Sequence, residues 1–283
     1  MRYNTRRGPL HPSLRSPRRC SSACRWICVL GLLAASLAQA AIPASERAVL
    51  DNLFASTNGQ GWAEKDHWGE EPGSECIWYG IDCDTVDGSE HVVAIDLIQN
   101  NLSGPLPALA NLTHLRHFFV PINSLTGEIP PLNAMTELRT FVVFANLLDG
   151  ALPALAGMSH LTTFDVSINQ LRGGIPELSG LVQLDAFDVS DNELRGAVPA
   201  LDGMTNLHFF EIGGNHLTGA LPDPPAPNNL TPGSSRLCIS LGPNLNALAP
   251  SQSLSWNIAS GSTPWYSACD TETIFADGYD DTQ

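Results

Sequence analysis

The chain has 283 residues, and 14 Lys and Arg against 29 Asp and Glu give it a formal net charge of −15. It is 43% hydrophobic and 15% charged, with 24 Gly and 21 Pro but no collagen triplet, so fibrous and disordered chains are excluded. The acidic excess argues against nucleic-acid binding, which needs a basic face to displace counterions from phosphates.

The beginning of the chain, over positions 1–40, has the organisation of an export signal. It contains seven Arg and no acidic residue, followed by an apolar run at 26–37 and the small-x-small site Ala38-Gln39-Ala40. We predict a signal peptide over 1–40, and a secreted, periplasmic or cell-surface protein without a transmembrane segment. Its removal leaves 243 residues with 7 basic and 29 acidic groups, a net charge of −22. The alternative, a retained membrane anchor, needs about 20 apolar residues.

The cysteines fit an exported protein. Removal of the leader takes away three of the seven and leaves Cys76, Cys83, Cys238 and Cys269. An even number in an exported chain indicates two disulfides. Three pairings are possible, and pairing near neighbours closes the shortest loops, which favours Cys76–Cys83 and Cys238–Cys269. A structural zinc site is the alternative, but the spacing lacks the C-x-x-C pairs typical of such sites.

An internal repeat of 23 residues organises the middle of the chain. Each of its six copies has an asparagine, a glycine four residues later and a proline seven residues later. The asparagines are Asn100, Asn123, Asn146, Asn169, Asn192 and Asn215. The apolar positions share this period, and the second copy, residues 115–130, spells L-x-x-F-x-V-x-x-N-x-L-x-G-x-I-P.

This period predicts a solenoid of stacked coils. A short strand such as 118–120 points alternate side chains inward, and strands about 4.8 Å apart form a parallel sheet whose apolar side the returning chain covers. We expect the asparagine amides to form a structural ladder that satisfies backbone groups at each bend. One column of aromatic residues is interpreted as a buried core spine rather than a ligand channel. It comprises Phe118, Phe141, Phe164, Phe187 and Phe210.

Over residues 92–222 the repeat resembles the leucine-rich repeat, in particular the plant-type subclass with its L-x-G-x-I-P half, although each unit is one residue shorter than usual. The resemblance implies an α/β-type leucine-rich-repeat solenoid with a parallel sheet on the concave face, short helical or irregular convex segments and disulfide-bonded caps. Residues 76–83 also resemble the C-x-W-x-G-V-x-C string of plant-type N-terminal caps, in which the two cysteines are bonded.

The segments that flank the repeats are predicted caps, because an open stack has two apolar ends. In the N-terminal cap, over 41–91, we expect Ser45 to cap a helix that runs to about Ser56. A C-terminal cap follows at 223–269. The acidic tail at 270–283 has few apolar residues, and its resemblance to short endings of exported bacterial proteins favours a bacterial source.

The strand face carries the residues that we predict to bind a partner, because repeat proteins commonly bind through it. These residues are Ile98, Phe119, Pro121, Val142, Phe144, Asp165, Asp188, Asp191, Phe209 and Glu211. The first half of the face is apolar and the second half is acidic. The hypothesis is that apolar residues anchor the partner while the acidic row steers a basic segment into place. A merely solvated surface is the alternative.

Catalytic, cofactor and metal sites are not predicted. The chain has no G-x-S-x-G, H-E-x-x-H or phosphate-loop motif, and a glycosidase pair such as Asp165 and Asp188 would lie on an open sheet without a pocket. A further column with the same period as the repeat holds His91, His114, Glu137 and His160. It could form a ladder of metal ligands, but exposed loop residues are the favoured interpretation.

The resemblance also implies a class of function. Plant-type leucine-rich repeats occur in receptor ectodomains and in polygalacturonase-inhibiting proteins, which engage ligands on the concave side. Since no transmembrane helix or kinase segment is expected, a soluble secreted binder of a protein or peptide is the nearer analogue. The alternatives are a structural or adhesive cell-surface protein and an inhibitor of a secreted hydrolase.

Overall fold

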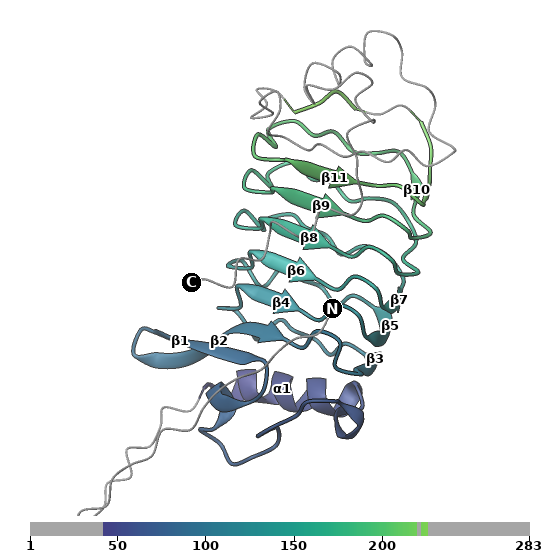
Figure 1. Ribbon diagram of the computed structural model, residues 1–283. Helices are drawn as coiled ribbons and strands as arrows, with labels where there is room; N and C mark the ends of the chain where they lie inside the picture. Colours follow the sequence, from purple (N-terminus) through teal and green to yellow (C-terminus); the bar gives the residue numbers. More distant parts are fainter. Residues whose placement is uncertain (1–41, 220–221, 226–283) are drawn as a thin grey trace, which may run out of the picture. The chain divides into compact units, whose positions relative to one another are not determined.

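A computed structural model describes residues 42–219 and 222–225 of the chain (Figure 1). The described residues all fall in one of the two units into which the chain divides, Ala38–Gln283. The predicted signal peptide, the C-terminal cap with its Cys238–Cys269 bridge and the acidic tail lie outside the described residues.

Six parallel strands, one from each coil, form the main sheet, and Figure 1 shows them stacked in chain order. They are β2 (Ser89–Asp96), β4 (His117–Phe119), β6 (Thr140–Val142), β8 (Thr163–Asp165), β9 (Ala186–Asp188) and β11 (Phe209–Glu211). The strand β1 (Ile81–Val86) pairs antiparallel with β2 and gives the order β1-β2-β4-β6-β8-β9-β11. Partners such as Phe118 and Phe141 occupy equivalent positions of successive copies, so the repeat length equals the strand register.

Smaller sheets form where the chain turns back. One consists of β3 (Ser103–Pro105), β5 (Ser124–Glu128) and β7 (Leu147–Asp149), and another of β10 (Arg195–Gly196) and β12 (His216–Leu217). Here the partners, for example Ser103 and Ser124, lie closer together in the sequence than one full repeat. Equivalent positions of neighbouring coils therefore align in the main sheet but are offset from one another in these smaller sheets.

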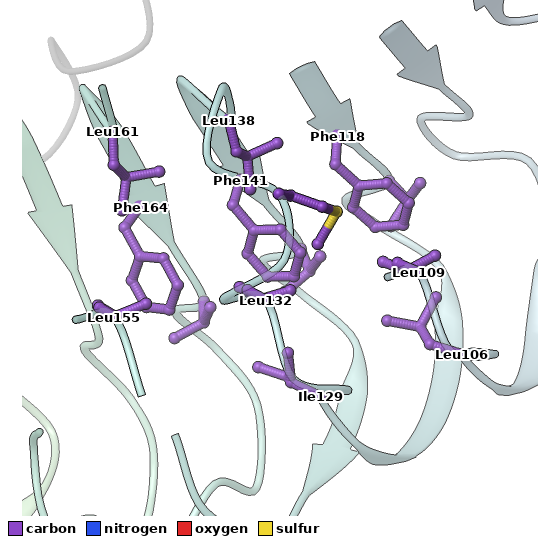
Figure 2. Close-up of a cluster of buried hydrophobic side chains, with 14 of the residues drawn as sticks. Leu106, Leu109, Phe118, Ile129, Leu132, Leu138, Phe141, Leu155, Leu161 and Phe164 are labelled. Carbon is purple, nitrogen blue, oxygen red and sulfur yellow. The ribbon is translucent and has the colours of Figure 1, made fainter. Parts of the chain in front are cut away.

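The predicted aromatic spine is confirmed as core. All five phenylalanines are fully buried, and successive rings stack with centroids 5.4 to 5.7 Å apart and planes inclined by 12° to 18°. Figure 2 shows Phe118, Phe141 and Phe164 in one file, with leucines of the returning chain, such as Leu109 and Leu132, packed beside them. The returning segments between the strands are turns and extended chain, so the irregular form of the predicted convex segments is the one observed.

Asparagine side chains tie each bend to the preceding coil. Asn146 Nδ2 donates to the carbonyls of Val120 at 3.1 Å, Val143 at 3.0 Å and Phe144 at 3.3 Å. Its Oδ1 accepts a hydrogen bond from the backbone N–H of Leu125 at 2.9 Å. The amide thus satisfies polar backbone groups of two coils that the bend would otherwise leave buried and unpaired.

The N-terminal cap begins with α1 (Ala44–Ser56), the only α-helix among the described residues. The prediction that Ser45 caps this helix is wrong, because Pro43 occupies the N-cap position and Ser45 lies inside the helix. The carbonyl of Pro43 accepts hydrogen bonds from the N–H groups of Glu46 and Arg47 at 2.9 and 3.0 Å. Pro43 has a ψ of 138°, in the extended range typical of an N-cap residue, and the helix begins directly after it, one residue before Ser45.

An aromatic cluster and a disulfide complete the cap. Trp68 packs against Trp62 and Trp78 with ring centroids 4.8 and 4.9 Å apart, and all three are buried. The short 3₁₀ turns η1 (Gly59–Gly61) and η2 (Glu75–Ile77) lie in the same segment. The predicted bond between Cys76 and Cys83 is present. Among the described helices, none has the length and apolar content that crossing a bilayer requires.

Candidate functional site

The outward side chains of the main sheet form what we call the strand face. In each short strand the central residue points into the core, so its neighbours point outward, as His117 and Phe119 do on either side of Phe118. The face continues past the strands to a column that directly precedes the ladder asparagines, which we call the rim. The rim consists of Gln99, Ile122, Ala145, Ile168, Asp191 and Gly214.

The ten predicted partner-binding residues differ in exposure. Ile98 and Asp191 are exposed, whereas Phe119, Phe144, Asp188 and Phe209 are half-buried. Pro121, Val142, Asp165 and Glu211 are buried. The expectation that all ten present their side chains at the surface therefore needs correction for these four. The apolar part of the strand face is therefore narrower than predicted. It consists of Phe119 and Phe144, flanked by Ile98 and by the isoleucines of the rim.

The acidic row is anchored to the backbone. Asp165 Oδ1 accepts hydrogen bonds from the N–H and the hydroxyl of Ser167 at 3.0 and 2.7 Å. Asp188 and Ser190 repeat this arrangement one coil later, at 2.9 and 2.6 Å, and Glu211 Oε1 accepts from the N–H of Gly213 at 3.0 Å. Sequence reasoning missed the two serines, although the D-x-S pattern in consecutive repeats was a visible signal. These carboxylates therefore have a structural role at the ends of their strands.

Burial and the charge of a neighbouring carboxylate keep Asp165 and Asp188 partly protonated at neutral pH. Asp165 and Asp188 are direct partners in the strand register. Burial, together with repulsion by Asp188, raises the pKa of Asp165 to about 7. Burial likewise raises the pKa of Asp188 to about 6, with a contribution from Asp191. At neutral pH the pair does not carry its full negative charge, and a cation placed beside it would favour the ionised form.

The rim contains two isoleucines in an unusual backbone conformation. Ile122 has φ of 57° with 43% of its surface exposed, and Ile168 has φ of 53° with 53% exposed. Their backbone N–H groups donate to the carbonyls of Phe144 and Ser190 in the next coils at 3.0 Å, so the conformation belongs to the hydrogen bonding between coils. A β-branched residue rarely adopts positive φ, and the strain costs about 1 to 2 kcal/mol. No pattern in the sequence reveals this strain.

The histidine column is built into contacts between coils. The rings of His91 and His114 lie 4.3 Å apart, His91 Nδ1 is 2.6 Å from Glu46 Oε1, and His114 Nδ1 is 3.2 Å from Glu137 Oε1. His160 Nδ1 is 3.1 Å from a backbone carbonyl of the preceding coil. Within the described part of the chain, no group of three or more His, Cys, Asp or Glu side chains is arranged to hold a metal ion.

Comparison with known proteins shows the fold. No protein-family model matches the sequence, and no curated protein sequence matches it either. The ectodomain of the receptor kinase SOBIR1 from Arabidopsis thaliana is similar, with a TM-score of 0.54 and 22% identity over 66% of this chain and 99% of that chain. A plant ice-binding protein has a TM-score of 0.58 and 23% identity over 72% of this chain and 73% of its own.

The Arabidopsis receptor kinase HAESA, solved with the peptide hormone IDA and the co-receptor SERK1, gives a TM-score of 0.57. Its identity to this chain is 23%, over 74% of this chain and 36% of the HAESA chain. This similarity agrees with the stacked repeats and the parallel sheet of the chain. The chain therefore has the leucine-rich-repeat fold, in the plant-type form that the sequence predicts.

Proposed function

We propose that this protein binds a protein or peptide partner through its strand face and rim. The observation that carries this proposal is the pair of strained, exposed isoleucines, Ile122 and Ile168. Departures from local sequence preferences are concentrated at functional sites, where the strain is retained because another property depends on it.

The chain shows that the bend does not need isoleucine. The equivalent rim position of the last described coil is Gly214, with φ of 62°, and the preceding coil has Asp191 with φ of 51°. Glycine and aspartate adopt positive φ at lower cost than a β-branched residue. Isoleucine at this position also exposes apolar area that burial against a partner would remove from water. The presence of isoleucine at two of the six rim positions is therefore best explained by an apolar contact with a partner.

The acidic end of the strand face indicates that the partner carries a basic group beside its apolar anchor. Ile98, Phe119 and Phe144 extend the apolar contact toward the N-terminal cap, and the exposed Asp191 lies at the acidic end of the face. A partner with an apolar anchor followed by Lys or Arg matches this order. The HAESA structure, which contains a peptide hormone, supports the proposal because it shows that this fold accommodates a peptide.

We further propose that the protein acts outside the cytoplasm as a binding module rather than as an enzyme. The basic, apolar and small-residue pattern of residues 1–40 supports export. The serine-bonded Asp165 and Asp188 act at strand ends, which gives them a role other than catalysis. Inhibition of a secreted hydrolase is a narrower form of the same proposal, and it would be indicated by a hydrolase as the captured partner.

The test is partner capture by a rim variant that keeps its fold. The double variant Ile122→Asn/Ile168→Asn removes the apolar side chains and introduces a residue that tolerates positive φ, so its Tm should equal or exceed that of the wild type. Partner capture from the host's extracellular fraction should be lost. The matched control is Leu147→Ser/Val182→Ser, which changes two exposed hydrophobic residues elsewhere. Equal capture by the rim variant and the wild type would refute the proposal.

A further inference from the structure

An open pocket lies where the N-terminal cap meets the first strand of the main sheet. Its volume is about 420 Å³. One wall is the loop of residues 76–82, which the Cys76–Cys83 disulfide closes, and the other is formed by Asp96 and Ile98 at the end of β2. The pocket thus adjoins the apolar end of the strand face, and one of its two walls belongs to the cap.

The loop wall is held firmly against the sheet. The N–H of Asp96 donates to the carbonyl of Gly80 at 2.7 Å, and a Cβ atom on Gly80 would come within 2.0 Å of the Asp96 carbonyl oxygen. Only glycine permits this approach. Tyr79 is fixed by two further hydrogen bonds, from Trp68 Nε1 to its carbonyl at 2.9 Å and from its N–H to the carbonyl of Asp66 at 3.0 Å. The wall is therefore preorganised for binding.

Three of the residues that line the pocket are large apolar side chains that the fold leaves exposed. Ile77 is 53% exposed, Tyr79 is 39% exposed and Ile98 is 40% exposed. They make up three of the seven large exposed hydrophobic residues of the described chain, although they occupy one small region. Exposed apolar residues scattered singly need no explanation, but a cluster on a rigid loop marks an interaction site.

Two carboxylates face the same space without a cationic partner among the described residues. Within that part of the chain, the Asp82 side chain makes no ion pair or hydrogen bond, and Asp96 Oδ1 accepts only a 3.3 Å bond from the N–H of Ile98. Two residues beyond Asp82 on the same strand, Asp84 is paired with Arg116 at 2.9 Å. Partial burial and the charge of Asp82 raise the pKa of Asp96.

His117, which interacts with the charge of Asp82, does not neutralise these acids at pH 7 because its pKa is lowered. His117, on the adjacent strand, has its pKa lowered by burial and by the charges of Arg139 and Arg116. An arrangement of two carboxylates and three apolar side chains matches an amphipathic cation, whose methylene stem needs apolar surface and whose charged head needs an anion. A purely apolar ligand would desolvate the carboxylates without compensation.

We propose that this pocket accepts a lysine or arginine side chain of a partner protein, with the stem against Ile77 and Ile98 and the charged head beside Asp82 and Asp96. The proposal rests on the proposed function in one respect, because it treats the pocket as an extension of the partner-binding face. It identifies a second recognition point at the cap, separate from the apolar contact at the rim.

The test uses a defined probe instead of the natural partner. The probe is the acetylated and amidated tripeptide Gly-Arg-Gly, with its lysine analogue and with the citrulline analogue as an uncharged isostere. Isoleucine methyl NMR signals of the full protein report where each peptide binds. We expect the signals of Ile77 and Ile98 to shift with the arginine and lysine peptides and not with citrulline, while those of Ile122 and Ile168 stay unchanged.

Matched variants separate specific binding from attraction to an acidic protein. Asp82→Asn/Asp96→Asn should weaken the arginine peptide about tenfold, as expected for two partly exposed charge pairs. Asp149→Asn/Asp202→Asn removes the same charge at exposed positions outside the pocket and should change the Kd by less than about twofold. An equal effect of the two double variants, or shifts outside the pocket only, would overturn the proposal. Loss of capture by the rim variant tests the proposed function separately, since this assay does not need the natural partner.

Discussion

Glu46, in the first turn of α1, is joined to His91, on β2 directly before the first repeat, by a contact of 2.6 Å between Oε1 and Nδ1. The second carboxylate oxygen accepts a 2.8 Å hydrogen bond from the N–H of Val92. Glu46 is buried, so the cap and the sheet share a desolvated carboxylate that is held in place through both of its oxygens. The cap is therefore attached to the solenoid by a polar contact as well as by its aromatic cluster.

Replacing Glu46 should destabilise the protein strongly. Glu46→Ala leaves the N–H of Val92 and the ring of His91 without their acceptor, and such loss of bonds to a charged group costs on the order of 2 to 3 kcal/mol. Urea unfolding followed by tryptophan fluorescence measures this change. Asp51→Ala, which removes an exposed carboxylate from the same helix, serves as the control and should cost less than about 1 kcal/mol. Equal losses would mean that the contact contributes little.

The buried acid on β8 should make stability depend on pH in the direction opposite to ordinary carboxylates. The pKa of Asp165 in the folded protein is about 7, above its ordinary value of 3.8, so the folded state takes up the proton first. The penalty of the charged form is complete above about pH 7, and it is relieved as the pH falls toward 4. Asp165→Asn keeps the acceptor for Ser167 and removes the charge.

We therefore expect Asp165→Asn to raise the free energy of unfolding at pH 8 by on the order of 2 kcal/mol and to change it little at pH 4.5. Paired urea titrations at the two pH values provide the measurement. Asp149→Asn, at an exposed position of β7, controls for the loss of one negative charge and should show no such difference. A gain at pH 4.5 as large as that at pH 8 would contradict the assignment.

The asparagine ladder should be sensitive even to an isosteric change. Asn169 donates to the carbonyls of Val143, Val166 and Ser167, and its Oδ1 accepts from the N–H of Leu148. Asn169→Asp keeps the acceptor but turns a carboxylate toward three carbonyl oxygens. We expect it to cost about 3 kcal/mol or more in unfolding free energy, because the buried carbonyls lose their donor.

The neighbouring substitution Gln170→Ala provides the control for the ladder, since Gln170 is exposed and its backbone N–H donates to the preceding coil. It should change the unfolding free energy by less than about 0.5 kcal/mol. A loss of stability for Gln170→Ala similar to that for Asn169→Asp would show that the bend, and not the amide, is the sensitive feature.

The sequence predicts the features of this fold that repeat. The constant repeat interval specifies the register of the main sheet, because a parallel pairing of identical strands joins equivalent residues, such as Phe118 and Phe141. The same reasoning places the phenylalanine spine in the core. The bonded Cys76 and Cys83 were predictable because a loop of this length favours local pairing and the string resembles a known cap.

The rest depends on interactions that no periodic pattern encodes. In the smaller sheets the paired residues are not at equivalent repeat positions, because neighbouring coils are offset from one another where the chain turns back. The burial of Asp165 depends on its surroundings across several coils, and alternation along a strand only indicates the direction of the side chain. The strain at Ile168 is a property of the backbone, whose N–H is bonded to the carbonyl of Ser190 in the next coil. The pocket forms only when a loop of the cap lies against the end of β2.

The asparagine contacts give the stack of coils a direction. Asn215 Oδ1 accepts from the N–H of Leu194 in the preceding coil, and Asn100, in the first coil, instead exchanges hydrogen bonds with the backbone of Glu64 in the cap. Removing the last coil would leave the N–H of Leu194 without its acceptor, whereas removing the coil before Asn215 would take away one of the three carbonyls to which its amide donates, that of Val189. The two ends of the stack therefore need different caps: the early end must supply partners for an asparagine side chain, and the late end must supply an acceptor for a backbone N–H.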